Sequence, residues 1–289
     1  MNTVWSDEIQ SSEILYYSRF GRFNDYNKDE WFSLLGIKNG MKVLEVGCGP
    51  GHFCNMIKKY FPSCQVYGVD LDDNHIDFAK QTSKMLGLDI NYSVGDVTNL
   101  QFDDNYFDII FSHTLVEHLP FDAFILGQKK VLKSGGKLVF IKIDQNKKHL
   151  NIFDGMSEQM NALENKLEFI DNNHIVGTFT KTPPEFLSEL KKYGFENMYV
   201  EFKDIMFYYP DKCQDKNQAI KQIKDMQNAE LYEMLFKLKN TTNGKQYQTQ
   251  LLQLLDAKYK MRLELLEANQ KVFDYESTAI MVYTATKTN

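Results

Sequence analysis

The chain has 289 residues, of which 43% are hydrophobic and 25% charged, so it has enough apolar material to fold around a core of its own. The formal net charge of -6 argues against a nucleic-acid ligand, because lysine and arginine contacts to phosphate dominate nucleic-acid affinity. No stretch approaches the roughly 18 apolar residues of a membrane span, and the acidic start of the chain lacks the apolar segment of a secretory signal.

Residues 8–36 are expected to be helical and carry an unusual number of aromatic side chains. Two interpretations stay open for this segment: a helix face packed on the core, or a lid over a ligand. The two are compatible, and we predict an N-terminal helical lid over residues 1–36.

From residue 41 onward, short apolar runs alternate with helical segments. The first part is predicted to contain strands 41–46, 65–70, 90–94, 107–112 and 137–143 and helices 52–60 and 74–86. A helix at 183–193 and strands at 198–202 and 277–286 are predicted further along. Apolar strands that alternate with helices are typical of a parallel sheet covered on both faces. The expected architecture is an α/β protein with a doubly wound, Rossmann-like sheet.

Between the last two predicted strands the pattern changes. Residues 217–238 and 246–273 have apolar side chains at helical spacing, and Asn-Thr-Thr-Asn-Gly at 240–244 is a turn signal. A helical hairpin inserted in an α/β domain is either a cap on the active site or an oligomer contact, and we favour the cap. The chain is then divided into the lid, a core of residues 37–205 and 276–289, and a helical cap of residues 206–275.

The strongest chemical signal is a glycine-rich loop between the first predicted strand and the next helix. Gly47, Gly49 and Gly51 follow the spacing G-x-G-x-G. Glycines let a backbone approach a ligand closely, and the following helix N-terminus offers free N–H donors. The dinucleotide fingerprint G-x-G-x-x-G would need a third glycine where His52 stands, so an NAD-dependent oxidoreductase is disfavoured.

Two acidic residues follow the next two predicted strands. Asp70 ends the second strand, where a carboxylate can accept hydrogen bonds from both hydroxyls of a ribose. Asp96 follows the third strand, where a carboxylate can accept a hydrogen bond from an exocyclic amine such as adenine N6. Each aspartate could instead cap a helix or form a turn. In register with the glycine loop, the pair indicates a nucleotide-like ligand.

Together these segments resemble the class I methyltransferases that depend on S-adenosylmethionine (SAM), and more narrowly the small-molecule branch similar to the ubiquinone/menaquinone enzymes (methyltransferase type 11). The matching segments are E-V-G-C-G-P-G at 45–51, V-D at 69–70, G-D-V at 95–97, F-D-I-I-F-S at 107–112, E-H-L at 117–119 and L-K-S-G-G-K-L at 132–138. The resemblance covers roughly residues 30–145 and fades afterwards. It implies a seven-stranded sheet whose last strand is antiparallel, with SAM as the cofactor and S-adenosylhomocysteine as its product.

The resemblance also implies roles for individual residues. Gly47, Cys48, Gly49 and Gly51 would line the methionine part of SAM, and Glu45 would support the loop and the ammonium. The other implied cofactor residues are Asp70 at the ribose, Leu71, Asp96 and Val97 around the adenine, Ser112 and His113 near the sulfonium, and Tyr17 and Arg22 from the lid.

Methyl transfer from SAM is an in-line displacement, for which a protein mainly supplies proximity and orientation. A base is needed only where the acceptor starts protonated. His113 is the candidate catalytic base, because a neutral histidine suits proton removal near pH 7. Glu117 and His118 belong to the family motif and are expected to be structural, and His174 is a further candidate in a loop.

The predicted function is methyl transfer to a small-molecule acceptor, and the alternative is a SAM-binding scaffold or interaction protein without turnover. A nucleic-acid methyltransferase is disfavoured, because residues 112–115 read S-H-T-L in place of the N/D-P-P-Y/F element of amino-directed enzymes. Four cysteines without a C-x-x-C pair indicate reduced thiols in a cytoplasmic protein, and no metal site is expected. The expected partners are a small-molecule substrate and, in a possible homodimer, a second copy of the chain, with no nucleic acid and no membrane span.

Overall fold

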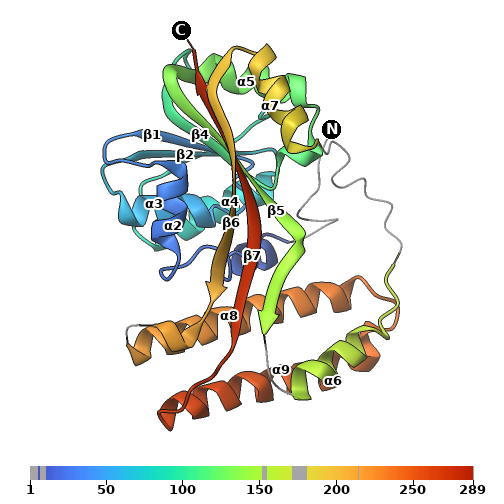
Figure 1. The fold of residues 1–289 in the computed structure, drawn as a ribbon. Helices are drawn as coiled ribbons and strands as arrows, with labels where there is room; N and C mark the ends of the chain where they lie inside the picture. Colours follow the sequence, from blue (N-terminus) through green and yellow to red (C-terminus); the bar gives the residue numbers. More distant parts are fainter. Residues whose placement is uncertain (1–5, 7–10, 152–154, 171–180, 214, 289) are drawn as a thin grey trace.

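The computed structural model describes residues 6, 11–151, 155–170, 181–213 and 215–288, with the side chains of all of these except 144–151. Figure 1 shows a sheet with helices on both sides and a further layer of helices beyond one end of its longest strands. The helices are α1 (Ser12–Ser18), α2 (Lys28–Leu35), α3 (His52–Tyr60), α4 (Asp73–Met85), α5 (Phe121–Val131), α6 (Gly155–Glu164), α7 (Pro183–Lys192), α8 (Lys216–Lys239) and α9 (Gly244–Glu267). The strands are β1 (Lys42–Val46), β2 (Gln65–Asp70), β3 (Asn91–Val94), β4 (Phe107–His113), β5 (Leu132–Asn151), β6 (Phe195–Tyr208) and β7 (Tyr275–Lys287).

The sheet has seven strands in the order β3-β2-β1-β4-β5-β7-β6. β1 to β5 pair in parallel, and β7 runs antiparallel to both of its neighbours. The predicted doubly wound sheet with an antiparallel last strand is therefore confirmed. The chain moves outward from β1 to β3 and then returns to β4, so the strand order reverses between β1 and β4. Ligands of open α/β sheets bind outside the carboxyl ends of the strands at such a point.

Two apolar clusters cover the two faces of the sheet. On one face, Trp31 of α2 and Phe53 of α3 pack with Val43 of β1. On the other face, Phe124 of α5 packs with Leu44 of β1. Neighbouring residues of β1 thus belong to opposite clusters, as the alternation of side chains along a strand requires.

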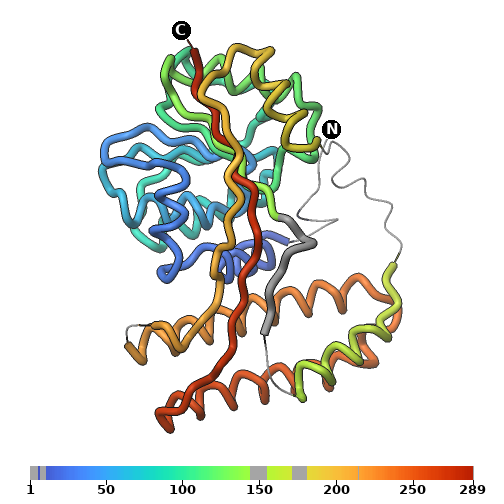
Figure 2. The backbone as a smooth tube through the Cα atoms, in the orientation of Figure 1, coloured from blue at the N-terminus to red at the C-terminus, as the bar shows by residue number. Residues whose placement is uncertain are grey.

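The predicted helical hairpin is present as α8 and α9. Figure 2 shows β6 and β7 running side by side out of the core toward these helices. The helices and α6 share an apolar cluster of their own, with Ile223 of α8, Leu255 and Tyr259 of α9 and Met160 of α6 all buried in it. α1 touches both α4 of the core and α8, so it lies between the sheet and the hairpin (Figure 1).

Several details differ from the sequence predictions, among them the start of β5 at Leu132, the longer β6 and the additional helices α5 and α6. Residues 8–36 do not form one helix, since turns separate α1 from α2. The helix predicted to reach residue 273 ends at Glu267, because Asn269 adopts a left-handed conformation with φ of 54°. β5 extends eight residues beyond its predicted end at Ile143, and its polar far end pairs with β7 as far as Asn151 and Tyr275.

Candidate functional site

The glycine-rich loop joins β1 to α3 and is built from left-handed residues. Gly47, Gly49 and Gly51 have φ of 67°, 51° and 81°, a region that L side chains rarely adopt. The backbone N–H groups of Gly47 and Cys48 both donate to the carbonyl of Val69 in β2, at 2.7 and 3.1 Å. The shape of the loop is thus fixed by hydrogen bonds within the protein.

The three glycines differ in how much space their surroundings leave for a side chain. A Cβ at Gly47 would meet the side chain of Leu115 at 2.7 Å, and a Cβ at Gly51 would overlap the side chain of Tyr92. At Gly49 the nearest atom would be a methyl carbon of Leu15 in α1, at 3.2 Å. Internal packing therefore requires the first and third glycines, and the loop faces the N-terminal segment at Gly49.

Asp70, at the end of β2, supports the same loop. Its Oδ2 accepts a hydrogen bond from the Gly49 N–H at 2.7 Å, and its Oδ1 accepts one from the Asp72 N–H at 3.0 Å. Burial raises the pKa of Asp70, and these hydrogen bonds partly oppose the rise. Each carboxylate oxygen keeps a second lone pair, so Asp70 can hold the loop and still bind a hydroxyl. The next residue, Leu71, is 43% exposed.

Asp96 and Val97 follow β3. Asp96 Oδ1 accepts hydrogen bonds from the N–H and the hydroxyl of Thr98, at 2.8 and 2.7 Å, so this aspartate forms a turn. The Asp96 side chain is exposed and Val97 is buried. The turn is one of the two roles that the sequence left open for Asp96, and a contact with adenine stays a prediction.

Ser112 and His113 end β4, beside β1. Both are buried, and among the described residues neither Ser112 Oγ nor His113 Nε2 has a hydrogen-bond partner. The His113 ring packs edge-on against Phe23, with ring centroids 4.8 Å apart. Burial and the positive charges of Arg19 and Arg22 hold the pKa of His113 well below its usual value, so its imidazole is neutral at pH 7. Each of these two polar atoms could be satisfied by a ligand group or a water molecule.

Glu45 is a buried carboxyl in β1, two residues before the first loop glycine. Its Oε2 accepts a hydrogen bond from the Cys54 thiol at 3.0 Å. Burial raises the pKa of Glu45 to about 8, against the opposing effects of Cys54 and the positive charge of Arg19. Glu45 is therefore protonated at pH 7, and a cation bound beside it would favour its ionised form.

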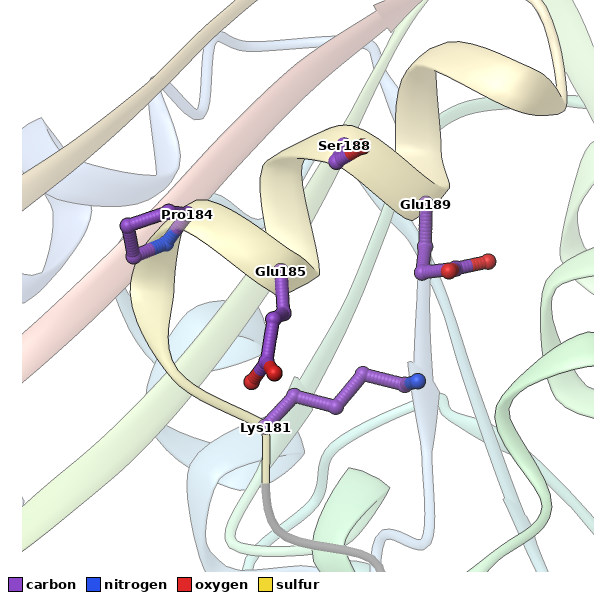
Figure 3. Close-up of a pocket in the computed structure, with 5 residues that line it drawn as sticks. All are labelled: Lys181, Pro184, Glu185, Ser188 and Glu189. Atoms are coloured by element: carbon purple, nitrogen blue, oxygen red, sulfur yellow. The ribbon is translucent and has the colours of Figure 1, made fainter.

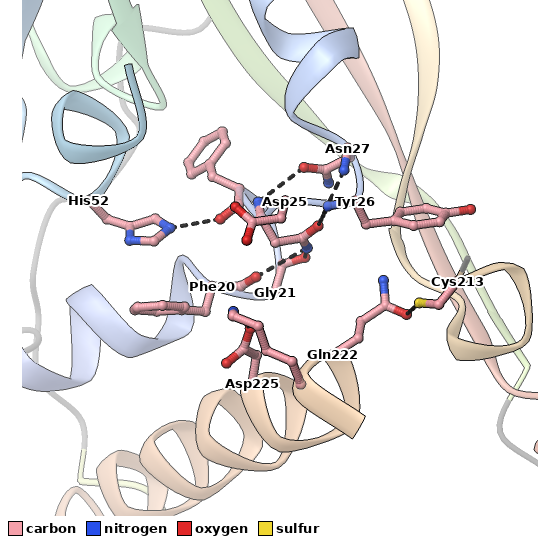
Figure 4. Close-up of polar contacts among 12 residues, drawn as sticks. Phe20, Gly21, Asp25, Tyr26, Asn27, His52, Cys213, Gln222 and Asp225 are labelled. Atoms are coloured by element: carbon pink, nitrogen blue, oxygen red, sulfur yellow. Dashed lines mark hydrogen bonds and ion pairs between the residues drawn. The ribbon is translucent and has the colours of Figure 1, made fainter. Parts of the chain in front are cut away.

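The N-terminal segment contacts both the core and α8, and Figure 4 shows the contact with the core at His52. The His52 ring, at the start of α3, donates through Nε2 to the carbonyl of Phe23 at 2.7 Å. On the other side, Tyr17 stacks on Tyr232 of α8, with ring centroids 4.5 Å apart. The N-terminal segment thus bridges the helix after the glycine loop and the inserted hairpin.

α1 is also bound to the start of α4. Ser12 Oγ and His75 Nδ1 lie 2.8 Å apart. The N–H and the hydroxyl of Ser6 both donate to the carboxylate of Asp72, which caps α4. The partners are 63 and 66 residues apart in the chain, so no local sequence pattern could have indicated these contacts.

The two lid residues predicted to reach the cofactor lie differently, and Arg19 is a further charged residue of the same segment. Tyr17 is stacked on α8, whereas the charge of Arg22 acts on His113. The positive charge of Arg19, which no sequence motif includes, lowers the pKa of both His113 and Glu45. Composition could have indicated it: only three of the 33 lysines and arginines are arginines, and two of those three lie in this turn.

The other candidates from the sequence are less informative. Glu117 and His118 form a short 3-10 turn after β4, and Glu117 Oε2 is buried without a hydrogen-bond partner in the described chain. His174 lies outside the described residues.

No group of three or more histidine, cysteine, aspartate or glutamate side chains in the described part of the chain could hold a metal ion. None of the described helices is both long enough and apolar enough to cross a membrane.

One surface hollow lies far from these residues in the chain. It has a volume of about 460 Å³ and lies against α7, lined by Lys181, Pro184, Glu185, Ser188 and Glu189 (Figure 3). The Glu185 carboxylate accepts hydrogen bonds from the N–H and the hydroxyl of Thr182, the residue that caps the start of α7. No predicted site residue lines this hollow, so it gives no support to a substrate site there.

The reversal of strand order and the left-handed glycine loop at the carboxyl end of β1 define a Rossmann-like α/β protein, a fold whose ligands bind at such a point. Comparison with known families makes this specific. Residues 37–257 match the model of a family described as a methyltransferase domain, and the chain belongs to this family.

Curated relatives match only part of the chain. A ubiquinone biosynthesis O-methyltransferase of Coxiella burnetii is 38% identical over 108 residues, which are 37% of this chain and 45% of that protein. Phosphoethanolamine N-methyltransferase 3 of Arabidopsis thaliana is 34% identical over 140 residues, which are 46% of this chain and 28% of that protein. The matches thus span less than half of the length of either relative.

A solved structure matches the whole chain. Phosphoethanolamine N-methyltransferase 2 of Haemonchus contortus, in complex with phosphomonomethylethanolamine and S-adenosylhomocysteine, aligns with a TM-score of 0.58 and 18% identity. The alignment covers 100% of this chain and 60% of that chain. At this identity the likeness shows the fold alone.

Proposed function

We propose that this chain transfers a methyl group from SAM to a small-molecule acceptor and releases S-adenosylhomocysteine. One observation carries the proposal. The glycine loop, Asp70 and the unpartnered atoms of Ser112 and His113 belong to the carboxyl ends of three adjacent strands in a methyltransferase-family chain. The names of the two relatives support methyl transfer and differ in the atom methylated, so the proposal names the cofactor and leaves oxygen and nitrogen acceptors for the assay.

The cofactor would be held mainly by polar groups that the protein fixes in place or leaves free to form hydrogen bonds. Asp70 is fixed by two backbone hydrogen bonds, and buried Glu45 suits the cofactor ammonium. The proposed contacts are the loop residues Gly47, Cys48, Gly49 and Gly51, then Glu45, Asp70, Leu71, Asp96, Val97, Ser112 and His113, with Tyr17 and Arg22 from the N-terminal segment.

SAM supplies the electrophile, a methyl group on a positively charged sulfur. The chain would orient the acceptor and exclude water, and His113 would receive a proton from the acceptor. A neutral ring with an unpartnered Nε2 is suited to that step. Residues 1–36 would act as a lid and residues 206–275 as a cap on a core formed by 37–205 and 276–289. A cytoplasmic location and a homodimer stay predictions from the sequence.

The test has two stages. SAM binding is measured first by calorimetry, and methyl transfer is then followed with labelled SAM and a panel of phenolic, amine and carboxylic acid acceptors. Binding followed by transfer to at least one acceptor is the expected result. Binding without transfer to any acceptor would favour the scaffold, and no binding would refute the proposal.

Replacing Asp70 with alanine should weaken SAM binding by about 1.5–3 kcal/mol, since hydrogen bonds to a charged group are lost. Calorimetric titration with SAM measures this change. Asp77→Ala is a matched control, because Asp77 is an exposed aspartate on the next helix. Unchanged affinity in Asp70→Ala would remove Asp70 from the cofactor site.

SAM binding should release a proton from Glu45. The pKa of Glu45 is raised to about 8, and pairing with the cofactor ammonium would lower it, so the affinity should rise from pH 6 to 8 and level off above. Calorimetry at pH 7 in buffers of different ionisation enthalpy counts the protons released. In Glu45→Gln the release should disappear, and an equal release in this variant would assign the proton to another group.

A further inference from the structure

The middle of β6 has no neighbouring strand on its outer side. β6 is the last strand in the sheet order, and among the described strands it pairs with β7 alone. At one end of this edge, the side-chain amides of Asn24 and Asn27 donate to the carbonyls of Phe207 and Met206, at 3.0 and 3.1 Å. Along residues 199–205, no such bond from elsewhere in the described chain reaches the outer edge. This run therefore carries backbone donors and acceptors with which another strand can pair.

The hydrogen bonds near the two ends of β6 show which residues of this run face outward. In an antiparallel pair, both backbone polar groups of a residue point to the same side, and the side alternates along the strand. The Thr288 N–H donates to the carbonyl of Gly194, so even-numbered residues of β7 face β6, and the register places them opposite odd-numbered residues of 199–205. The outward carbonyl of Met206 agrees with this alternation. The residues of the run that face outward are therefore the even-numbered ones, Val200, Phe202 and Asp204.

The side chains of this run combine exposed aromatic rings with charges of both signs. Phe202 is 60% exposed and Tyr199 is 48% exposed. Glu201 and Lys203 lie on one face of the strand, 4.0 Å apart, and both side chains are partly exposed. Charge on an edge strand commonly prevents pairing with another chain. Here opposite charges stand two residues apart, so their effect depends on the register of the incoming strand.

A second copy of β6 meets these charges favourably in one register. In an antiparallel pair whose two-fold axis passes through Phe202, Glu201 of each copy lies opposite Lys203 of the other. The outward-facing groups also meet, because Phe202 lies opposite itself and Val200 opposite Asp204. Moving the axis by one residue would place Glu201 opposite Glu201 or Lys203 opposite Lys203, and like charges directly opposite each other are destabilising.

The two ends of the run suit this pairing as well. Met206, whose carbonyl already accepts a hydrogen bond from Asn27, would lie opposite residue 198 of the second copy. At that point β6 is no longer regular, because its register with β7 shifts between Glu196 and Tyr199. The regular part of the second strand would thus end where the N-terminal turn begins to cover the first.

We infer that the outer edge of β6 is an interface with a second copy of this chain, paired antiparallel about Phe202. The sheet would continue from one copy into the other, and the exposed ring of Phe202 would pack against its counterpart. The charges of Glu201 and Lys203 would alternate in sign around the axis, within each copy and between the copies. This interface is independent of the proposed function, since none of the proposed cofactor contacts lies in β6.

The test is sedimentation equilibrium of the full chain over a range of concentrations. The unmodified chain should dimerise, and Glu201→Lys and Lys203→Glu should each raise the dissociation constant about tenfold or more, because each change places like charges opposite one another twice. The double variant that carries both changes exchanges the two signs and should restore dimerisation. The control is Lys84→Glu, which makes the same change of charge at an exposed position of α4 and should leave the dissociation constant unchanged.

Three results would overturn the inference. The first is a chain that stays monomeric at every concentration, and the second is a dimer that neither single variant weakens. The third is a double variant that dimerises no better than the single ones, since the loss would then not come from the pairing of Glu201 with Lys203. Circular dichroism of each variant confirms that it is folded. SAM binding is measured separately, so failure of this inference leaves the proposed function to its own test.

Discussion

Replacing His113 with alanine is expected to lower kcat by roughly 10²–10⁴-fold, the usual contribution of a positioned acid or base. The ring lies at the end of β4 with Nε2 unpartnered among the described residues, and it is neutral at pH 7. Arg19 and Arg22 help to hold the pKa of His113 down.

The measurement is steady-state kinetics together with calorimetric binding of SAM. SAM affinity should fall less than kcat in His113→Ala, because the ring is proposed to contact both the cofactor and the acceptor. His113→Gln keeps a hydrogen-bonding group and cannot act as a base near pH 7, so it should be nearly as slow as His113→Ala. Recovery of most activity in His113→Gln would show that the ring only orients the acceptor. Full activity in His113→Ala would exclude both roles.

Replacing Asp274 with alanine is expected to reduce the free energy of unfolding by about 3–5 kcal/mol, because it leaves a buried guanidinium without its carboxylate. Asp274 precedes β7 and pairs with Arg262 of α9, with side chains only 3% and 1% exposed. Arg262 also donates to the carbonyl of Lys258 at 2.7 Å, and Lys258 pairs with Glu230 of α8 at 2.8 Å. The network joins both hairpin helices to the last strand.

Urea denaturation followed by circular dichroism measures this loss. The control is Lys260→Ala, which removes an exposed pair with Glu264 on the same helix, at 4.0 Å, and should cost about 0–1 kcal/mol. A loss in Asp274→Ala no larger than in the control would mean that the buried pair contributes little to holding the hairpin.

The stability of the N-terminal segment bears on how its lid role can be tested. Phe23 is 2% exposed and stacks on Phe53 of the core at 4.2 Å between ring centroids. Removing residues up to Phe23 would therefore expose the core as well as the site. Point substitutions such as Arg22→Gln separate the function of the segment from its packing.

The sequence by itself determined the sheet, the glycine loop and the family. Each depends on short-range patterns: apolar runs of strand length, glycines at positions that need positive φ, and aspartates directly after strands. The loop glycines could be predicted from the local sequence because their positive φ favours glycine: Gly47, Gly49 and Gly51. Asp70 could be predicted because it stands at the end of an apolar strand.

Only the tertiary structure decided which groups share the site. Arg19 acts on Glu45 and His113, and Ser12 contacts His75, across separations in the chain that no periodicity records. The polar end of β5 became a strand because β7 offers it backbone partners. Burial and the pairing of distant groups arise only when the chain is folded, and they decide which polar atoms stay free to bind a ligand.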